Sequence, residues 1–491
     1  MGKDTAQDKT VIMHCTGLSR ALKAQFISFR EGVADHKGAV SSVSIDSRTV
    51  LPGALFVALI GAVQDGHRYV QAAFEAGAAA AMIARSRWED PQSELAETAR
   101  KFYGILLVVE DTLKGLQEAA AYYLERFPRL LKIGITGSSG KTTTKEILGA
   151  MIRREKTVVM NQGNLNSETG LPLSVFMVRS SHEVGIFELG MNRHGEIEEI
   201  TGVLKPHIAL ITNIGSAHIG FFGSKQAIAE EKKAIFSKFS GNECALIPAD
   251  DPYRDFLAAG VRGRVILYGP PMMEKLGEVR DRGIGGVELV WDGVPVCCGL
   301  PGAHNLRNIL AAAAIAGEVP ISSRSIRAGL EAVKGIFGRT EILRGPVTVI
   351  QDCYNANPES MTAAIGMCDD LDEAGRRIYV IGSMLELGGR SQEAHRMIGL
   401  RLASSKADLV CLYGEETKAA LEALQSLKGR EQKAPFFHTT RMDELSAFLS
   451  GFIRSGDVVL LKGSRTCALE QLTEGLMAAA GSETPAAKGV C

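Results

Sequence analysis

The stretch that most constrains the fold of this chain runs from Leu130 to Thr144. It consists of an apolar segment, a glycine-rich turn and the start of a helix, in the order LLKIGI-TGSSG-KTTT. The apolar segment is typical of a parallel strand that is buried on both faces. Gly137 and Gly140 allow backbone N–H groups to curl around an anion, and a helix beginning near Lys141 adds the positive end of its dipole. The stretch therefore predicts a strand–loop–helix unit that binds phosphate.

The side chains at the start of this helix suit a nucleotide. Lys141 supplies a mobile cation for the outer phosphates, and Thr142 supplies a hydroxyl for Mg²⁺. The usual motif, G-x-x-x-x-G-K-[ST], has glycine where this chain has Ile135, so the pattern here is G-x-x-G-K-T-T. A Gly-Lys-Thr run directly between a strand and a helix favours a nucleotide site over a purely structural turn. The loop residues expected to contact the nucleotide are Gly137, Ser138, Ser139, Gly140, Lys141, Thr142 and Thr143.

Composition limits the kinds of protein that this chain can be. Its 491 residues predict roughly three domains, and a hydrophobic content of 45% suffices for a sizeable core. The net charge of -1 argues against nucleic acid as a bulk electrostatic partner. The nine cysteines are scattered and form no C-x-x-C, which favours a reduced, cytoplasmic protein over a disulfide scaffold or a zinc site. No apolar run approaches the roughly 20 residues needed to cross a bilayer, so no membrane insertion is expected.

Residues 1–128 are expected to form a small α/β domain, in which short strands alternate with an Ala-rich helix over residues 69–81. Polar residues follow two of the expected strands, and α/β sheets bind ligands at such strand ends. These candidate binding residues are Ser47, Arg48, Asp65 and His67. On the residues alone, ligand binding and plain loop capping remain equally open.

Residues 129–335 are expected to form a central nucleotide-binding domain with a mostly parallel sheet. Glu188 follows a short strand expected at 184–187. A carboxylate at the carboxyl end of a strand, in the sheet that carries the phosphate loop, is well placed to hold Mg²⁺. His218 follows the strand expected at 207–212 and shares this edge. The alternatives are an ordinary strand-end glutamate and a structural histidine.

Three other segments of this domain carry patterns that bear on its function. The turn-rich loop 161–170 is long enough to be a binding loop, or it is a plain surface loop. The charges of the helix expected at 224–239 suit a solvated face. Asn305 and Asn308 are three residues apart, on one face of an Ala-rich helix expected at 302–316.

Residues 336–491 are expected to form a third, Rossmann-like domain, joined through a hinge at 338–341. Strand-like runs alternate with helical ones, which implies a parallel sheet. The expected strands are 347–351, 379–381, 409–412 and 458–461. Their loops would share the ligand-binding edge of the sheet. Because G-x-G-x-x-G is absent, no dinucleotide is expected there.

Taken in order, these motifs resemble those of the Mur ligases, and the resemblance covers nearly the whole chain. The matching segments are 46–48, 65–67, 137–144, 161–170, 188–190, 212–218, the helix that contains Lys232, 302–308, 338–339, 352–358, 386–388 and 462–465. The resemblance implies a cytoplasmic, ATP-dependent ligase of peptidoglycan synthesis with three α/β domains. It implies ATP and Mg²⁺ as cofactors. The binding loop of the family usually carries Asn and Ile where this chain has Ser167 and Thr169, which puts fine substrate contacts in question, whereas the absence of glycine at position 135 is read as a family trait.

The resemblance also implies roles for individual residues. Thr142 and Glu188 would hold one Mg²⁺, and His218 would help to hold a second. Lys232 matches a family lysine that becomes carbamylated into a carboxylate-like ligand, although Lys233 beside it leaves the register open. The implied catalytic residues are Lys141, Glu188, His218 and Lys232. The implied nucleotide contacts beyond the loop are Asn305, Asn308, Arg339 and Asp352.

The loop at 352–358 is most similar to that of the family member that joins D-alanyl-D-alanine to UDP-N-acetylmuramoyl-tripeptide. It differs from the D-N-P-R signature of the member that adds a diamino acid. The residues implied to contact the two substrates are Ser47, Arg48, Asp65, His67, Asn164, Asn166, Asn355 and Asn357. A monomer is expected. The alternatives are a Mur ligase that adds a single amino acid, and a nucleotide-dependent regulatory pseudoenzyme; a folylpolyglutamate synthetase should lack the first domain.

Overall fold

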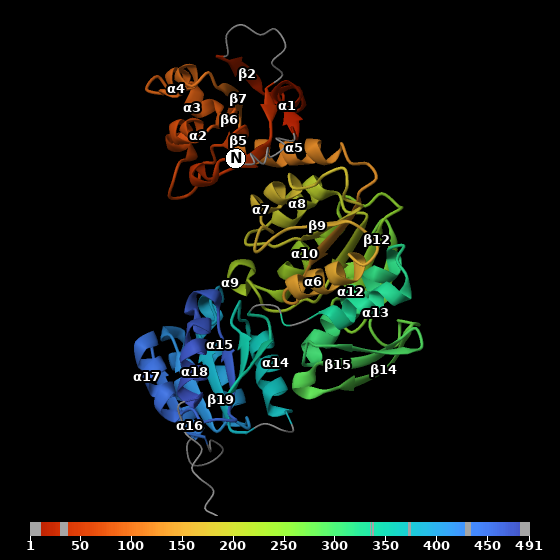
Figure 1. Ribbon diagram of the computed structural model, residues 1–491, viewed down its shortest axis with the longest axis vertical. Helices are drawn as coiled ribbons and strands as arrows, with labels where there is room; N and C mark the ends of the chain where they lie inside the picture. Colours follow the sequence, from red (N-terminus) through yellow and green to blue (C-terminus); the bar gives the residue numbers. More distant parts are fainter. Residues whose placement is uncertain are drawn as a thin grey trace, which may run out of the picture.

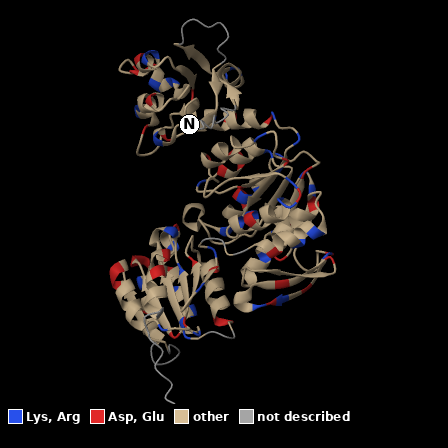
Figure 2. Ribbon diagram, viewed as in Figure 1, with Lys and Arg blue, Asp and Glu red and all other residues tan. Residues whose placement is uncertain are grey.

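The structure, a computed structural model, describes residues 11–29, 38–333, 335, 338–371, 375–427 and 434–481 (Figure 1). The chain folds into three successive α/β units, which are stacked along the long axis of the molecule in Figure 1. The fold class predicted from the sequence is therefore confirmed. Acidic and basic residues are interspersed along the ribbon of all three units (Figure 2), in keeping with the small net charge. Among the described residues, no helix is long and apolar enough to cross a membrane.

The first unit is built on a five-stranded sheet in the order β2-β7-β6-β5-β4, in which β2 alone runs antiparallel to its neighbour. Its strands are β2 (Gln25–Ser28), β4 (Ser42–Ser44), β5 (Ala54–Val57), β6 (Ala80–Ala84) and β7 (Ile105–Val109), with β1 (Met13–His14) and β3 (Ala39–Val40) paired separately. The helices are α1 (Cys15–Leu22), α2 (Val70–Glu75), α3 (Arg85–Trp88), α4 (Leu95–Lys101) and α5 (Thr112–Leu124). The helix expected over 69–81 was predicted too long, because Gly77 adopts a φ of 97° that stops it.

The central unit is built on a six-stranded, fully parallel sheet in the order β13-β12-β11-β8-β10-β9. Its strands are β8 (Leu131–Thr136), β9 (Val158–Met160), β10 (Val184–Glu188), β11 (Ile208–Ile211), β12 (Cys244–Pro248) and β13 (Arg264–Tyr268). The helices are α6 (Lys141–Ile152), α7 (Gly170–Val175), α8 (Glu196–Leu204), α9 (Ile219–Phe222), α10 (Lys225–Lys233), α11 (Arg254–Ala258), α12 (Ala303–Glu318) and α13 (Ser323–Ala332). An antiparallel meander of β14 (Leu276–Asp281), β15 (Val287–Trp291) and β16 (Val294–Cys298) turns at the predicted Asp292-Gly293 hairpin.

The central sheet is covered on both faces, which explains its continuous apolar strands. On β11, Leu210 packs into the core formed with α6, α12 and α13, whereas Ala209 and Ile211 pack into the core on the opposite face. The expected strand β8 and helix α6 flank the glycine-rich loop, so the strand–loop–helix prediction is confirmed. The charged helix α10 ends at Lys233, earlier than the predicted residue 239, and continues as a short 3₁₀ turn.

The third unit is built on a six-stranded sheet in the order β17-β18-β22-β19-β20-β21, in which only β17 is antiparallel. The strands are β17 (Glu341–Arg344), β18 (Thr348–Asp352), β19 (Arg377–Gly382), β20 (Leu409–Tyr413), β21 (Phe436–Thr439) and β22 (Val458–Lys462). The helices are α14 (Pro358–Asp369), α15 (Ser391–Ala403), α16 (Lys418–Leu427), α17 (Met442–Phe452) and α18 (Leu472–Gly481). All four expected strands are present. The two edge strands β17 and β21 were not predicted, and β17 begins within the expected hinge.

The packing of α13 on α6 supports the helix that follows the phosphate loop, and it requires a glycine. A Cβ on Gly329 would lie 2.3 Å from the Cα of Met151. We expect Gly329→Ala to lower the free energy of unfolding by about 1–3 kcal/mol, the usual cost of overpacking. Gly317→Ala, on α12 with no atom within 4 Å of the new Cβ, should instead stabilise the protein by roughly 0.5–1 kcal/mol. Urea unfolding measures both changes, and equal stability of the two variants would contradict the packing argument.

Candidate active site

The glycine-rich loop between β8 and α6 has a shape that only glycine permits at two positions. Gly137 has a φ of 148° and Gly140 a φ of 80°. A Cβ on Gly137 would lie 1.7 Å from Thr212 Oγ1, and one on Gly140 would lie 2.1 Å from Asn308 Oδ1. Asn308 therefore packs directly against the loop, and its contact with the nucleotide stays a prediction.

The residues that follow β11 hold this loop in place. Thr212 Oγ1 donates a hydrogen bond of 2.6 Å to the carbonyl of Ser139, whose N–H donates to Asn213 Oδ1 at 3.1 Å. The N–H of Ser138 donates to the Asn213 carbonyl, and the N–H of Gly215 donates to Ser138 Oγ at 2.8 Å. Thr212 and Asn213 were not predicted as site residues. A polar Thr-Asn pair that ends the strand beside β8 was the signal that could have found them.

Lys141 and Thr142, at the start of α6, point toward different partners. Lys141 Nζ bends back over the loop and donates to the Gly137 carbonyl at 2.9 Å. Burial lowers the pKa of Lys141, against the opposing charge of Glu188. Thr142 Oγ1 donates a 2.6 Å hydrogen bond to Glu188 Oε2, so the two predicted magnesium ligands are in contact.

Glu188, at the end of β10, is a buried carboxylate that remains ionised. Burial alone would raise its pKa, but the positive charges of Lys141 and Arg339 and the hydrogen bond from Thr142 hold the pKa below its usual value. Its second carboxylate oxygen accepts from Asn166 Nδ2 at 2.7 Å. The site therefore offers an oriented anion beside the phosphate loop.

The loop 161–170 orients Glu188 through its first residue as well as through Asn166. Asn161 accepts from the Glu188 N–H at 3.0 Å and donates to the Glu188 carbonyl at 3.0 Å. Lys145 Nζ in turn donates to the Asn161 carbonyl at 2.7 Å. Asn161 was not predicted as a site residue, whereas the predicted Asn164 is exposed. The loop is thus part of the site and not a plain surface loop.

Lys232, and not Lys233, faces the site. Its side chain is 1% exposed, and Nζ lies 3.4 Å from Met191 Sδ. Burial lowers the pKa of Lys232 well below its usual value, and the charge of Lys141 lowers it further. Lys233 Nζ points elsewhere and donates to the Phe256 carbonyl at 2.7 Å. The geometry therefore favours the register that the resemblance suggested.

His218 makes a contact that the sequence did not predict. Its backbone has a φ of 62°, and Nδ1 lies 2.9 Å from Oε2 of Glu386, a residue of the third unit. The side-chain contact with His218, helped by the charge of Lys141, holds the pKa of Glu386 below its usual value, against its partial burial. No group of three or more His, Cys, Asp or Glu that could hold a metal occurs among the described residues.

The remaining predicted nucleotide contacts lie around the junction of the second and third units. Asn308 Nδ2 donates to Asn305 Oδ1 at 3.2 Å, and Asn305 Nδ2 donates to the Pro301 carbonyl. The Arg339 guanidinium lies 4.1 Å from the centre of the Tyr354 ring. Asp352 pairs with the buried Lys462 of its own sheet, at 2.9 Å.

Two predicted dipeptide contacts have structural roles in the loop after β18. Asn355 Oδ1 accepts from the N–H of Ala356 at 2.8 Å, and Lys462 Nζ donates to the Asn355 carbonyl at 3.0 Å. Asn357 caps the amino end of α14, where its Oδ1 accepts from the N–H of Ser360 at 2.8 Å. The loop is fixed locally, at the carboxyl edge of the third sheet.

In the first unit, hydrogen bonds occupy the predicted substrate residues. Asp65 Oδ1 lies 2.6 Å from His67 Nδ1, and His67 Nε2 accepts from the N–H of Ala84 at 2.8 Å. Both ring nitrogens of the buried His67 are therefore used, which favours a structural role for it. Arg48 pairs with Asp46 at 2.6 Å and is otherwise exposed, next to Ser47 at the start of a 3₁₀ turn.

Together, the parallel sheet, the glycine loop with its lysine, and the carboxylate held by Thr142 define a P-loop nucleotide-binding enzyme. Family models for the Mur ligases match the chain in three segments. They are the "Mur ligase family, catalytic domain" at residues 39–123, the "Mur ligase middle domain" at 135–316 and the "Mur ligase, glutamate ligase domain" at 338–465. The chain belongs to the Mur ligase family.

Relatives and solved structures agree with this assignment over nearly the full length. The UDP-N-acetylmuramoyl-tripeptide–D-alanyl-D-alanine ligase of Treponema pallidum is 44% identical over 445 residues, which cover 90% of this chain and 95% of that protein. The crystal structure of MurF from Acinetobacter baumannii superposes with a TM-score of 0.82 at 30% identity, covering 94% of this chain and 98% of that one. MurF from Thermotoga maritima in complex with ADP superposes with a TM-score of 0.76 at 27% identity, covering 90% of this chain and 98% of that one.

Proposed function

We propose that this chain is the ATP-dependent ligase that joins D-alanyl-D-alanine to UDP-N-acetylmuramoyl-tripeptide. The observation that carries the proposal is the 44% identity to a ligase of that name over 90% of this chain. The phosphate loop with Lys141, Thr142 and Glu188 supplies the site that an ATP-dependent reaction requires. The reaction forms a precursor of the cell wall, in the cytoplasm.

The chemistry divides into two transfers. The terminal carboxylate of the tripeptide attacks the γ-phosphorus of ATP, which forms an acyl phosphate and releases ADP. The amine of D-alanyl-D-alanine then attacks the acyl carbon and loses a proton, and inorganic phosphate leaves as the amide forms. The first transfer needs positioning and charge neutralisation more than covalent help. The backbone N–H groups of the loop and the Lys141 ammonium provide both.

The donor set at the end of β10 fits Mg²⁺. Glu188 supplies an ionised carboxylate and Thr142 a hydroxyl, and Mg²⁺ is commonly held by one or two carboxylates together with substrate phosphates. When bound there, Mg²⁺ would neutralise charge on the transferred phosphoryl group. Asn166 holds the other oxygen of Glu188, which fixes the direction of the carboxylate.

Lys232 is suited to become a carbamate. Carbon dioxide reacts with a neutral amine, and burial together with the charge of Lys141 favours the neutral form of this lysine. The product carries a negative charge, which would offset the positive charge of Lys141 nearby. As an ammonium, Lys232 cannot ligate a metal; as a carbamate, it adds an oxygen ligand beside Glu188.

The third unit docks on the central unit close to the nucleotide site. Besides the His218–Glu386 contact, the N–H of Gly220 donates to the Glu386 carbonyl at 3.3 Å. Glu359 Oε1 accepts from Ser216 Oγ at 2.6 Å and from Lys225 Nζ at 2.9 Å. The segment 216–225, which supplies these contacts, directly follows Gly215, whose N–H donates a hydrogen bond to Ser138 of the phosphate loop. We infer that docking brings the dipeptide to the acyl phosphate and shields that intermediate from water.

An activity assay tests the proposed reaction directly. With UDP-N-acetylmuramoyl-tripeptide and ATP, phosphate release should require D-alanyl-D-alanine and should not be supported by single amino acids. Lys141→Ala should lower turnover by at least about 10²–10³-fold, because it removes the cation that stabilises the transferred phosphate. Release supported equally by a single amino acid would place the chain with another Mur ligase. Unchanged turnover of Lys141→Ala would contradict the role of the phosphate loop.

The adjacent residues Lys232 and Lys233 provide a variant and a matched control that test whether Lys232 is carbamylated. Lys232→Ala should lose on the order of 100-fold in turnover, whereas Lys233→Ala should keep most of its activity, because only Lys232 faces the site. Carbon-13 NMR in labelled bicarbonate should detect a carbamate in the wild type and in Lys233→Ala, and none in Lys232→Ala. A carbamate signal that survives in Lys232→Ala would contradict the assignment.

Docking is tested at a backbone contact. A Cβ on Gly220 would lie 2.6 Å from the backbone nitrogen of Gly388, so Gly220→Ala should push the third unit away. The kcat/KM for the dipeptide should fall at least about tenfold, a loss of about 1.4 kcal/mol. ADP affinity, measured by calorimetry, should stay within about twofold, because the phosphate loop is unaltered. Gly202→Ala on α8, where the nearest atom is 3.8 Å away, is the control and should leave both unchanged.

A further inference from the structure

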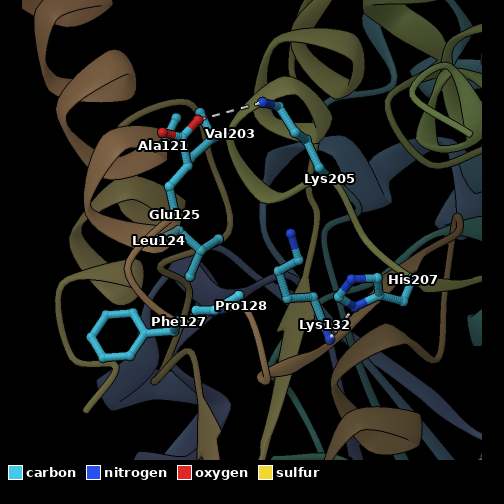
Figure 3. Close-up of a pocket in the computed structure, with 9 residues that line it drawn as sticks. All are labelled: Ala121, Leu124, Glu125, Phe127, Pro128, Lys132, Val203, Lys205 and His207. Atoms are coloured by element: carbon cyan, nitrogen blue, oxygen red, sulfur yellow. Dashed lines mark hydrogen bonds and ion pairs between the residues drawn. The ribbon is translucent and has the colours of Figure 1, made fainter. Parts of the chain in front are cut away.

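A cavity lies between the first and central units, away from the active site (Figure 3). Its volume is about 230 Å³. Its walls come from α5, from the linker after it, from β8, and from the end of α8 with the residues beyond. The lining residues are Ala121, Leu124, Glu125, Phe127, Pro128, Lys132, Val203, Lys205 and His207. Lys132 lies near the start of β8, and the phosphate loop follows the end of this strand. At about 3.3 Å per residue, roughly 16 Å of strand separates Lys132 from Gly137.

The cavity has more positive than negative charge. Lys132 and Lys205 both line it, and Glu125 is its one carboxylate. Lys205 Nζ lies 4.0 Å from Glu125 Oε1. Within the described part of the chain, no carboxylate lies within ion-pair distance of Lys132 Nζ. Figure 3 shows the Lys132 side chain rising into the cavity. Burial lowers the pKa of Lys132, and the charge of Lys205 lowers it further, against the opposing charge of Glu125.

His207 adds a directed donor to this cavity. Its Nδ1 accepts a hydrogen bond of 3.0 Å from the backbone N–H of Lys132. In the neutral ring, the proton therefore sits on Nε2, which can donate. Burial lowers the pKa of His207, which favours this neutral form. Lys132 and the His207 ring thus line a small space whose other wall is apolar and comes from Leu124 and Phe127. Lys205 also lines it, although its side chain is 57% exposed and its ammonium points toward Glu125 (Figure 3).

We propose that this cavity binds a small oxyanion, either a phosphate or a short carboxylate, between Lys132 and Lys205. One negative charge would relieve the repulsion between the lysines and leave the cavity close to neutral. A nucleotide is too large, because pockets for drug-sized ligands span about 300–1,000 Å³. Both lysines belong to the central unit, so the bound anion would join the start of β8 to the end of α8, and the apolar residues of α5 and the linker after it would cover it.

Competitive labelling of lysines tests this proposal on the whole protein. Trace acetic anhydride is added with inorganic phosphate, with acetate, or with chloride at the same ionic strength, and mass spectrometry reports the labelling of each lysine. At a concentration ten times its dissociation constant, the effective anion should slow acetylation of Lys132 about tenfold relative to chloride. Protection by phosphate alone identifies a phosphate site, and protection by acetate identifies a carboxylate site. Lys141 is monitored in the same samples, so binding at the phosphate loop is counted separately.

Two variants complete the design. Lys205→Ala removes an exposed side chain and should abolish most of the protection of Lys132. Lys114→Ala is the control. It removes an exposed lysine that lies outside the cavity, on the cavity-lining helix α5, and it should leave the protection of Lys132 unchanged. Acetylation of Lys132 that is equal in phosphate, acetate and chloride would overturn the proposal. Protection that persists in full in Lys205→Ala would also overturn it.

Discussion

The active site depends on one buried carboxylate. Glu188 is 3% exposed, and a carboxylate in such a place would normally take up a proton. It stays ionised because the positive charges of Lys141 and Arg339 surround it and Thr142 donates to it. These groups come from the phosphate helix and from the segment that enters the third unit. The ionisation of Glu188 therefore requires the loop, the helix and the chain beyond residue 337 to be in place together.

A second set of contacts links the phosphate loop to the third unit. Gly215 donates a hydrogen bond to Ser138 of the phosphate loop. Ser216 donates a hydrogen bond to Glu359 of the third unit, and His218 contacts Glu386 of the same unit. One short segment thus contacts both the loop expected to bind ATP and two loops of the third unit. The segment therefore supports both the phosphate loop and the docked third unit through a few hydrogen bonds. These contacts involve Glu359, which the motif analysis had not singled out, and Glu386, which lies in the matching segment 386–388.

The local part of the structure could be predicted from the sequence, and the contacts between distant segments could not. All residues of the strand–loop–helix unit at 130–152 are consecutive in the sequence, so the apolar pattern and the glycines suffice to predict it. Edge strands such as β21 carry less of this pattern, and β17 lies in a segment whose motif suggested a hinge. The partner of His218 is 168 positions away in the sequence, at Glu386, and no spacing rule predicts that contact. The sequence also left open whether His67 binds a ligand or has a structural role. The structure favours the structural role, because its two ring nitrogens contact Asp65 and the N–H of Ala84.

The contact between Gly220 and Gly388 is made by main chain on both sides. A surface of this kind recognises the course of the backbone and not the identity of side chains. Neighbouring residues such as Phe221, whose side chain is 58% exposed, can therefore be exchanged with little effect on how the two units meet. The two glycines cannot, since any side chain there would act as a spacer. Engineering of the interface thus has to keep these two glycines and the side-chain contacts of Glu359 and Glu386, and it can vary exposed neighbours such as Phe221.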